Sequence, residues 1–179
     1  MSVRRGSLKA VLALVACLFL AATMTAAKDP ASAAKYCSAD VARQKLQCHD
    51  TPEELNRSLE LSGVDTGKKA KGTEGPRLKS ESTETAQAAS VIGTVYDNSG
   101  YGGGYLNIVG DSCGSGYTDF IDLTWTGWND RLSSFIGGSG CRLYLHEHSN
   151  GTGAGYGWYA SSSWVGTMND RTSSISFSP

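Results

Sequence analysis

The last 89 residues of this chain predict an all-β fold, a compact sandwich of short strands. Runs rich in β-branched and aromatic residues are separated by Gly, Ser, Asn and Asp, a pattern typical of strands joined by turns. Apolar and polar residues alternate within 119–125 and 142–146, which indicates strands with one buried face. No stretch of this half combines helical periodicity with capping residues. The runs are VIGTVY, YLNIV, DFIDLTW, CRLYLH, YGWYA and SSISF.

Four parts are predicted along the chain. Residues 1–27 read as a signal peptide, and 28–62 as a short helical segment closed by a disulfide. Residues 63–90 read as a flexible linker, because they hold no aromatic residue and almost no large apolar one. The β domain then covers 91–179.

The first 27 residues have the composition of an export signal. Charged residues at 4–9 precede an apolar stretch at 10–22, and small residues at 25–27 offer a cleavage point. The apolar stretch is shorter than the roughly 20 residues that span a bilayer. RRGSLK partly resembles a twin-arginine signal and LVAC a lipobox, so the export route stays open. We expect a secreted protein with no membrane attachment after signal removal.

The second part carries helix signals. Thr51 followed by Pro52 and two glutamates fits an N-cap, a proline at N1 and an acidic first turn. Leu55, Leu59 and Leu61 then predict a narrow apolar face. A second short helix around 38–46, closed by a disulfide, is a further expectation.

Four cysteines remain once Cys17 leaves with the signal. An even number in an exported protein favours disulfides, with three connectivities open. We prefer Cys37–Cys48 and Cys113–Cys141, because each pair lies within one compositional region.

Charge argues against a polyanionic partner. The whole chain has a net charge of −1, and the β domain has seven acids, three arginines and no lysine, a net −4. We therefore expect no nucleic-acid partner.

The phrase N-D-R-x-S-S occurs twice, at 129–134 and 169–174. Each copy follows a candidate hairpin, and the two hairpins have the same internal spacing of marker residues. Tyr96, Tyr101 and Gly103 mark the first hairpin, and the second has His146, Gly151 and Gly153 at the same offsets. The fourth position of the phrase, Leu132 or Thr172, is where we expect the loop to constrain the choice of side chain least.

This layout resembles the βγ-crystallin superfamily. Its Greek-key motif carries Y/F-x(4)-Y/F-x-G in the first hairpin, and calcium-binding members carry N/D-N/D-x-x-S/T-S in a later loop. The resemblance covers about 91–179 and implies two Greek-key motifs forming one sandwich. It departs in the second hairpin, where His146 and Gly151 replace the aromatics, and in the longer first half, where 110–116 reads as an inserted loop tied to Cys141.

The loop chemistry suits Ca²⁺, a hard cation that takes six to eight oxygens. Asn and Asp favour turns and offer side-chain oxygens, and Ser supplies hydroxyls. The resemblance implies that loop oxygens combine with oxygens from the first hairpin of the other half, so that 97 pairs with 169–173 and 147 with 129–133. Calcium is the expected cofactor. The candidate ligands are Asp97, Asp130, Arg131 (carbonyl), Ser133, Glu147, Asp170, Arg171 (carbonyl) and Ser173.

Alternatives remain open. The loops can keep these residues for turn hydrogen bonds alone. Small secreted crystallin-fold peptidase inhibitors also resemble this chain, with 110–118 as the reactive segment and an extracellular peptidase as partner. A killer-toxin-like glycan binder with exposed aromatics is the third reading. A serine nucleophile at Ser112 and zinc at His146 and His148 both lack the supporting spacing, so no catalytic residue is expected.

Overall fold

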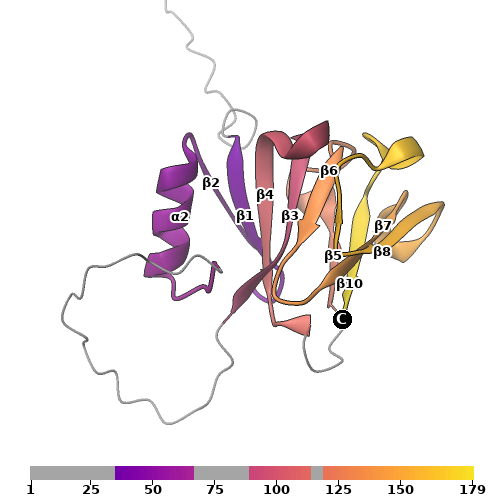
Figure 1. The fold of residues 1–179 in the computed structure, drawn as a ribbon. Helices are drawn as coiled ribbons and strands as arrows, with labels where there is room; N and C mark the ends of the chain where they lie inside the picture. Colours follow the sequence, from indigo (N-terminus) through magenta and orange to yellow (C-terminus); the bar gives the residue numbers. More distant parts are fainter. Residues whose placement is uncertain (1–34, 67–88, 114–118) are drawn as a thin grey trace, which may run out of the picture.

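The strands form two sheets that stack into a sandwich (Figure 1). The computed structural model describes residues 35–66, 89–113 and 119–179. The larger sheet has the strand order β2-β1-β4-β3-β6-β9 and the smaller one β5-β10-β7-β8. The all-β fold class is confirmed. The predicted signal, and most of the predicted linker, lie outside the described residues.

Each half of the β domain repeats one order of elements. A long hairpin with a short 3₁₀ turn at its tip comes first, followed by a strand, a 3₁₀ turn and a last strand. In the first half these are β3 (Ser90–Asn98), η1 (Ser99–Tyr101), β4 (Gly102–Gly110), β5 (Asp119–Asp122), η3 (Leu123–Trp125) and β6 (Ser134–Gly137). In the second they are β7 (Arg142–His146), η4 (Ser149–Gly151), β8 (Gly155–Tyr159), β9 (Ser161–Ser162), η5 (Gly166–Met168) and β10 (Ser174–Ser178).

The two halves exchange one strand each. β5 of the first half pairs with β10 in the smaller sheet, and β9 of the second half pairs with β6 in the larger sheet. Each Greek-key motif therefore depends on the other for a neighbouring strand. This exchange locks the halves together as one unit, with the C-terminal strand β10 between β5 and β7.

The alternation predicted from the sequence places apolar side chains between the sheets. Leu143 and Leu145 of β7 are buried, whereas Arg142 is exposed and Tyr144, between the two leucines, is only partly buried. Gly93 of β3 is needed for close packing, because a Cβ there would lie 2.9 Å from the Phe177 ring. The core cluster also includes Leu106, Ile108, Ile121, Leu123, Trp128, Leu132, Phe135, Met168 and Ile175.

The segment before the helix is a hairpin, so the prediction of a helix at 38–46 is wrong. β1 (Tyr36–Asp40) and β2 (Lys45–His49) pair antiparallel, and β1 also pairs parallel with β4. The free edge of β4 supplies backbone partners that no local sequence pattern reveals. Cys37 and Ala39 face the sandwich core from this added strand.

The helix α2 (Pro52–Leu61) forms as expected, with the Thr51 hydroxyl accepting a hydrogen bond from the Glu54 backbone N–H. Leu55 and Leu59 are buried beside Val109. Leu61, however, is 83% exposed, which corrects its assignment to the apolar face. Residues 55 and 59 stand one turn apart on one side, and 61 points elsewhere. None of the helices among the described residues is long and apolar enough to cross a membrane.

Both preferred disulfides are present. Cys37–Cys48 joins directly opposed residues of β1 and β2, and Cys113–Cys141 ties the end of the first hairpin to the start of β7. The ends of the predicted linker also meet, because Asp65 exchanges backbone hydrogen bonds with Ala89 and Val91. Each disulfide closes a loop within one region, and the regions are joined by strand pairing and by the packing of α2 and β1 against the sandwich.

Candidate cation site at the paired loops

The two N-D-R-x-S-S loops have the same local geometry. Asp130 and Asp170 both adopt left-handed backbone conformations, with φ of 56° and 53°. Asn and Asp are the non-glycine residues that tolerate this region best, which explains their place in the phrase. In each loop the Asn side-chain N–H₂ donates to the neighbouring Asp carboxylate at 2.7 Å.

The loops face each other across the sandwich. The Asp130 N–H donates to the Thr172 carbonyl, and the Asp170 N–H donates to the Leu132 carbonyl. The Ser173 hydroxyl also lies 3.4 Å from a carboxylate oxygen of Asp130. Oxygens of both loops thus come together, a contact between the loops that the resemblance did not include.

Each loop is bound to the hairpin of its own half. The Ser133 N–H donates to the Tyr96 carbonyl and its hydroxyl donates to the Asp97 carbonyl at 2.5 Å. The Ser173 N–H donates likewise to the His146 carbonyl. These contacts differ from the expected pairing of 97 with 169–173 and 147 with 129–133, because the hairpin packs against the loop that follows it in the chain.

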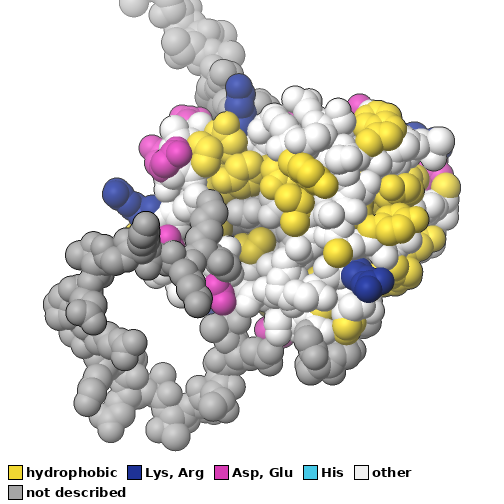
Figure 2. Space-filling view, viewed as in Figure 1, with side chains coloured by type: hydrophobic (Ala, Val, Ile, Leu, Met, Phe, Trp, Pro, Cys, Tyr) yellow, Lys and Arg dark blue, Asp and Glu magenta, His cyan; other side chains and the backbone are white. Residues whose placement is uncertain are grey.

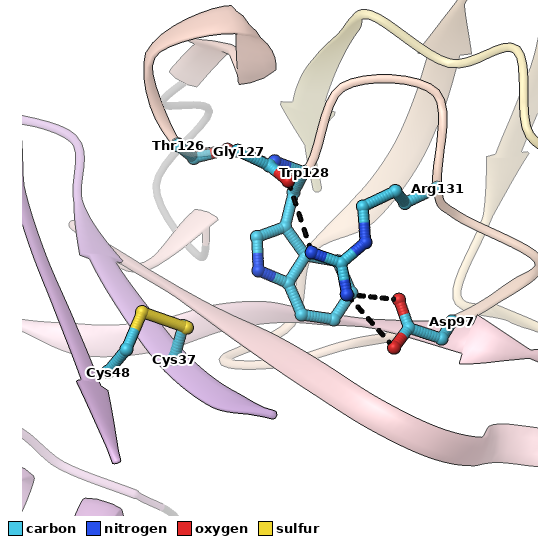
Figure 3. The surroundings of a disulfide bond; sticks show 7 residues. All are labelled: Cys37, Cys48, Asp97, Thr126, Gly127, Trp128 and Arg131. Carbon is cyan, nitrogen blue, oxygen red and sulfur yellow. Dashed lines mark hydrogen bonds and ion pairs between the residues drawn. A yellow bond between two sulfur atoms is a disulfide. The ribbon is translucent and has the colours of Figure 1, made fainter. Parts of the chain in front are cut away.

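The hairpin carboxylates are held by arginines. One guanidinium nitrogen of Arg131 lies 3.0 and 3.1 Å from the two carboxylate oxygens of Asp97 (Figure 3). Arg171 donates to one carboxylate oxygen of Glu147, and the other accepts from the Ala154 N–H. Each arginine also donates to the carbonyl four residues before it. The hydrogen bond from Arg171 lowers the pKa of Glu147. The arginine side chains thus act as tethered counter-ions beside the loops.

Buried polar atoms in both loops lack a partner within the described residues. The side-chain oxygens of Asn129 and Asn169 are buried and accept no hydrogen bond. An unsatisfied buried acceptor lowers the stability of the fold by about 1–3 kcal/mol. Two of them at equivalent positions therefore need a physical explanation. A cation or an ordered water would supply the missing partner.

The available donors are oxygens, and this fits calcium better than a softer metal. The described residues contain no cluster of three or more His, Cys, Asp or Glu. Calcium would therefore depend on hydroxyl, amide and carbonyl oxygens with few carboxylates. This composition is that of a weak site.

The second serine of each loop has a structural role that sequence reasoning missed. The Ser134 hydroxyl donates to the Asn98 carbonyl and accepts from the Tyr101 N–H. Ser174 makes the equivalent bonds to the His148 carbonyl and the Gly151 N–H. These serines pin each hairpin tip to its loop, which explains why the phrase ends in two serines.

The fourth position is not the permissive one that we expected. Leu132 and Thr172 are both fully buried. The position differs between the loops because each side chain packs into its own part of the interior, not because the position faces solvent.

The second hairpin keeps the backbone of the first despite its altered side chains. Tyr101 and Gly151 both have positive φ, at 64° and 71°, and Gly103 and Gly153 match at 81° and 84°. In the first hairpin Tyr96 and Tyr101 pack edge to face, with centroids 5.8 Å apart. Gly151 leaves that space to Phe120, whose ring would lie 3.6 Å from an added Cβ.

We predict that stability falls as pH drops from 7.5 to 5.5, in part through His146. Burial lowers the pKa of His146 below its ordinary 6.5, so the unfolded chain binds a proton more readily. Unfolding measured by urea titration across this range should show a weaker pH dependence in His146→Gln, which can still bond Ser176. The lowered pKa of Glu147 acts only below about pH 4.5, outside this window. Equal pH dependence in both proteins would contradict the assignment to His146.

Sequence comparison with known proteins finds no match, either to a family model or to a curated protein. Solved structures do show similarity. A βγ-crystallin domain from Clostridium beijerinckii is 24% identical, with a TM-score of 0.39, and the match covers 49% of this chain and 97% of that one. A βγ-crystallin domain from Flavobacterium johnsoniae is 25% identical, with a TM-score of 0.38, and the match covers 48% and 92%. The N-terminal domain of Protein S is 18% identical, with a TM-score of 0.39, over 48% and 92%.

These values describe a likeness over half the chain. We assign the architecture from the strand topology of this chain. It has two motifs that each begin with a hairpin and lend one strand to the other's sheet, and the duplicated loops face each other. The fold is βγ-crystallin-like. The hairpin β1–β2 extends the larger sheet of this fold at its β4 edge, and the helix α2 packs beside Val109 of β4.

Proposed function

We propose that this protein is a secreted, non-catalytic, calcium-binding βγ-crystallin-like module. The observation that carries the proposal is the pair of facing loops, each with a buried Asn oxygen that has no partner in the part of the chain that the structure describes. The two disulfides support secretion, because such bonds persist in oxidising compartments.

The loop oxygens are the first candidates to hold calcium. We propose Asp130 with Ser173 for one site and Asp170 with Ser133 for the other. The carbonyls of Arg131 and Arg171 and the buried side-chain oxygens of Asn129 and Asn169 complete the donor sets. Asp97 and Glu147 contribute only if they release their arginines. The bound ion would supply charge neutralisation and a common centre for the loop oxygens.

We expect each site to bind with a dissociation constant of about 10⁻⁴–10⁻³ M, the range of extracellular modules with few carboxylates. At about 10 mM Ca²⁺ a site of this affinity stabilises the fold by roughly 1.4–2.7 kcal/mol. The secreted protein should therefore release or absorb heat on calorimetric titration and melt at a higher temperature in Ca²⁺ than in Mg²⁺ at equal ionic strength.

The matched variants are Asp130→Asn with Asp170→Asn, because Asn tolerates the same left-handed backbone and keeps one oxygen while losing the charge. We expect this pair to weaken calcium binding without unfolding the protein. Asp111→Asn alters an exposed carboxylate outside the loops and should leave binding unchanged. Equal stabilisation of all three proteins by Ca²⁺ would contradict sites at these loops.

Processing tests the other part of the proposal. Expression of the full chain in a bacterial host should place it outside the cytoplasm, with a new N-terminus near residue 28 or 34. N-terminal sequencing of the exported protein locates the cut. An uncleaved chain that stays in the cytoplasm would contradict secretion.

A further inference from the structure

The outer face of the smaller sheet carries a strip of aromatic rings. Phe120 lies on β5, Tyr144 and His146 on β7, and Trp158 on β8. We call these four residues the aromatic strip. On β5 and β7 they alternate with the buried Ile121, Leu143 and Leu145, so they face away from the core. Phe120 is 38% exposed and Trp158 43% exposed.

The strip runs straight across four strands. Phe120 and Tyr144 flank Ser176 of β10 in one cross-strand row. Because neighbouring strands lie about 4.8 Å apart, the row from β5 to β8 is about 14 Å wide. The ring of Tyr144 is 5.4 Å from that of Trp158 and 4.8 Å from that of His146. Figure 2 shows hydrophobic side chains gathered over the β7 and β8 side of the molecule.

The backbone is shaped to present these rings. A Cβ on Gly155 would collide with the Tyr144 ring, so only glycine lets that ring lie across β8. Gly157 has a φ of 152°, and the register between β7 and β8 shifts so that Trp158 is an extra residue, a β-bulge. Bulges re-aim side chains, and this one turns Trp158 toward Tyr144.

Polar groups are interspersed with the rings, and charge is scarce. The Ser176 hydroxyl lies between Phe120 and Tyr144 and bonds the His146 ring at 2.9 Å. Arg142 flanks the row on β7, and Asp122 at the end of β5 is engaged by Thr124. The domain as a whole is net negative and holds no lysine. Nucleic acid and anionic membranes need surfaces rich in basic residues, which this domain lacks.

We propose that the aromatic strip binds a neutral polysaccharide chain along its 14 Å row. Flat rings stack on the C–H faces of sugars, and the hydroxyl, imidazole and guanidinium groups between and beside them bond sugar hydroxyls. The charges beside the strip are few and of both signs, so an uncharged ligand suits this surface better than a charged one.

The test uses the secreted protein and a panel of neutral hexasaccharides, namely chitohexaose, cellohexaose, laminarihexaose and mannohexaose. Tryptophan fluorescence and calorimetry should detect binding of at least one member, both in Ca²⁺ and in EDTA. Trp158→Ala and Phe120→Ala should each weaken that binding about tenfold, since each removes one stacking ring. Near-ultraviolet circular dichroism and melting temperature show whether the variants remain folded.

Trp164→Ala is the matched control, because Trp164 is 52% exposed but lies outside the strip. It should leave binding unchanged. No binding to any hexasaccharide overturns the proposal, and so does equal loss in the Trp164 variant. Binding only to heparin or to anionic vesicles, or only to a protein partner, also overturns it. A failure to bind calcium does not decide this outcome, because the strip acts through the rings of β5, β7 and β8, whereas the second loop contacts β7 through the His146 backbone carbonyl.

Discussion

Replacing Trp128 by alanine is expected to lower the free energy of unfolding by about 3–5 kcal/mol. The side chain is 1% exposed and is the largest buried residue of the core. Its backbone N–H bonds the Thr126 hydroxyl, and the Arg131 guanidinium lies 4.4 Å from its ring centroid (Figure 3). Truncation removes the buried indole and leaves a cavity that the surrounding strands fill only in part. Urea unfolding followed by circular dichroism measures the loss.

Two control variants separate the effect of burying the Trp128 ring from other effects. One removes an exposed indole, and the other removes the arginine that contacts the Trp128 ring. Trp164→Ala removes an indole that is 52% exposed and should change stability by less than about 0.5 kcal/mol. Arg131→Gln removes the ring contact and the partly exposed ion pair with Asp97, which is worth no more than about 1 kcal/mol. A cost in Arg131→Gln equal to that in Trp128→Ala would show that the arginine, not burial, dominates.

Removal of the Cys113–Cys141 disulfide by a double alanine substitution is expected to cost about 3–4 kcal/mol. The bond closes a loop with a sequence separation of 28, and the stabilisation from restricting the unfolded chain grows with loop length. Both cysteines are also buried in the sandwich core, so their loss removes packing as well. Unfolding under non-reducing conditions gives the value.

The Cys37–Cys48 pair provides the comparison. Its separation is 11, so the same reasoning gives a smaller cost of about 2.5–3 kcal/mol for the corresponding double substitution. If the shorter loop proves the more costly to open, chain entropy is not the term that ranks the two bonds. In that case the pairing of β1 with β4 would depend on the disulfide.

The domain fold was predictable because its signals are local. The alternation of apolar and polar residues in 142–146 indicates a strand with one buried face. The duplicated phrases, each behind its own hairpin, indicate two equivalent halves. The hairpin at 36–49 was not predictable, because its strand β1 pairs with the β4 edge about 70 residues further along the chain. Leu61 was misassigned for a different reason: its spacing from Leu59 places it off the buried face.

The candidate site was predictable in composition but not in its contacts. The phrase correctly marked loops whose Asp residues need left-handed backbone and whose oxygens meet. It did not reveal that Arg131 and Arg171 engage Asp97 and Glu147, because an ion pair between distant segments leaves no trace in local spacing. Nor did it reveal the separate roles of the two serines, which follow from the distance of each to the hairpin tip.

The calcium sites themselves are tested most directly by nuclear magnetic resonance of the ¹⁵N-labelled secreted protein during a Ca²⁺ titration. We predict shifts in the side-chain amide signals of Asn129 and Asn169 and in the backbone amides of 130–133 and 170–173. These shifts should saturate in the range of about 10⁻⁴–10⁻³ M and fail to appear with Mg²⁺. Signals that stay unchanged at about 10 mM Ca²⁺, or that shift only outside the two loops and their hairpins, would contradict this prediction.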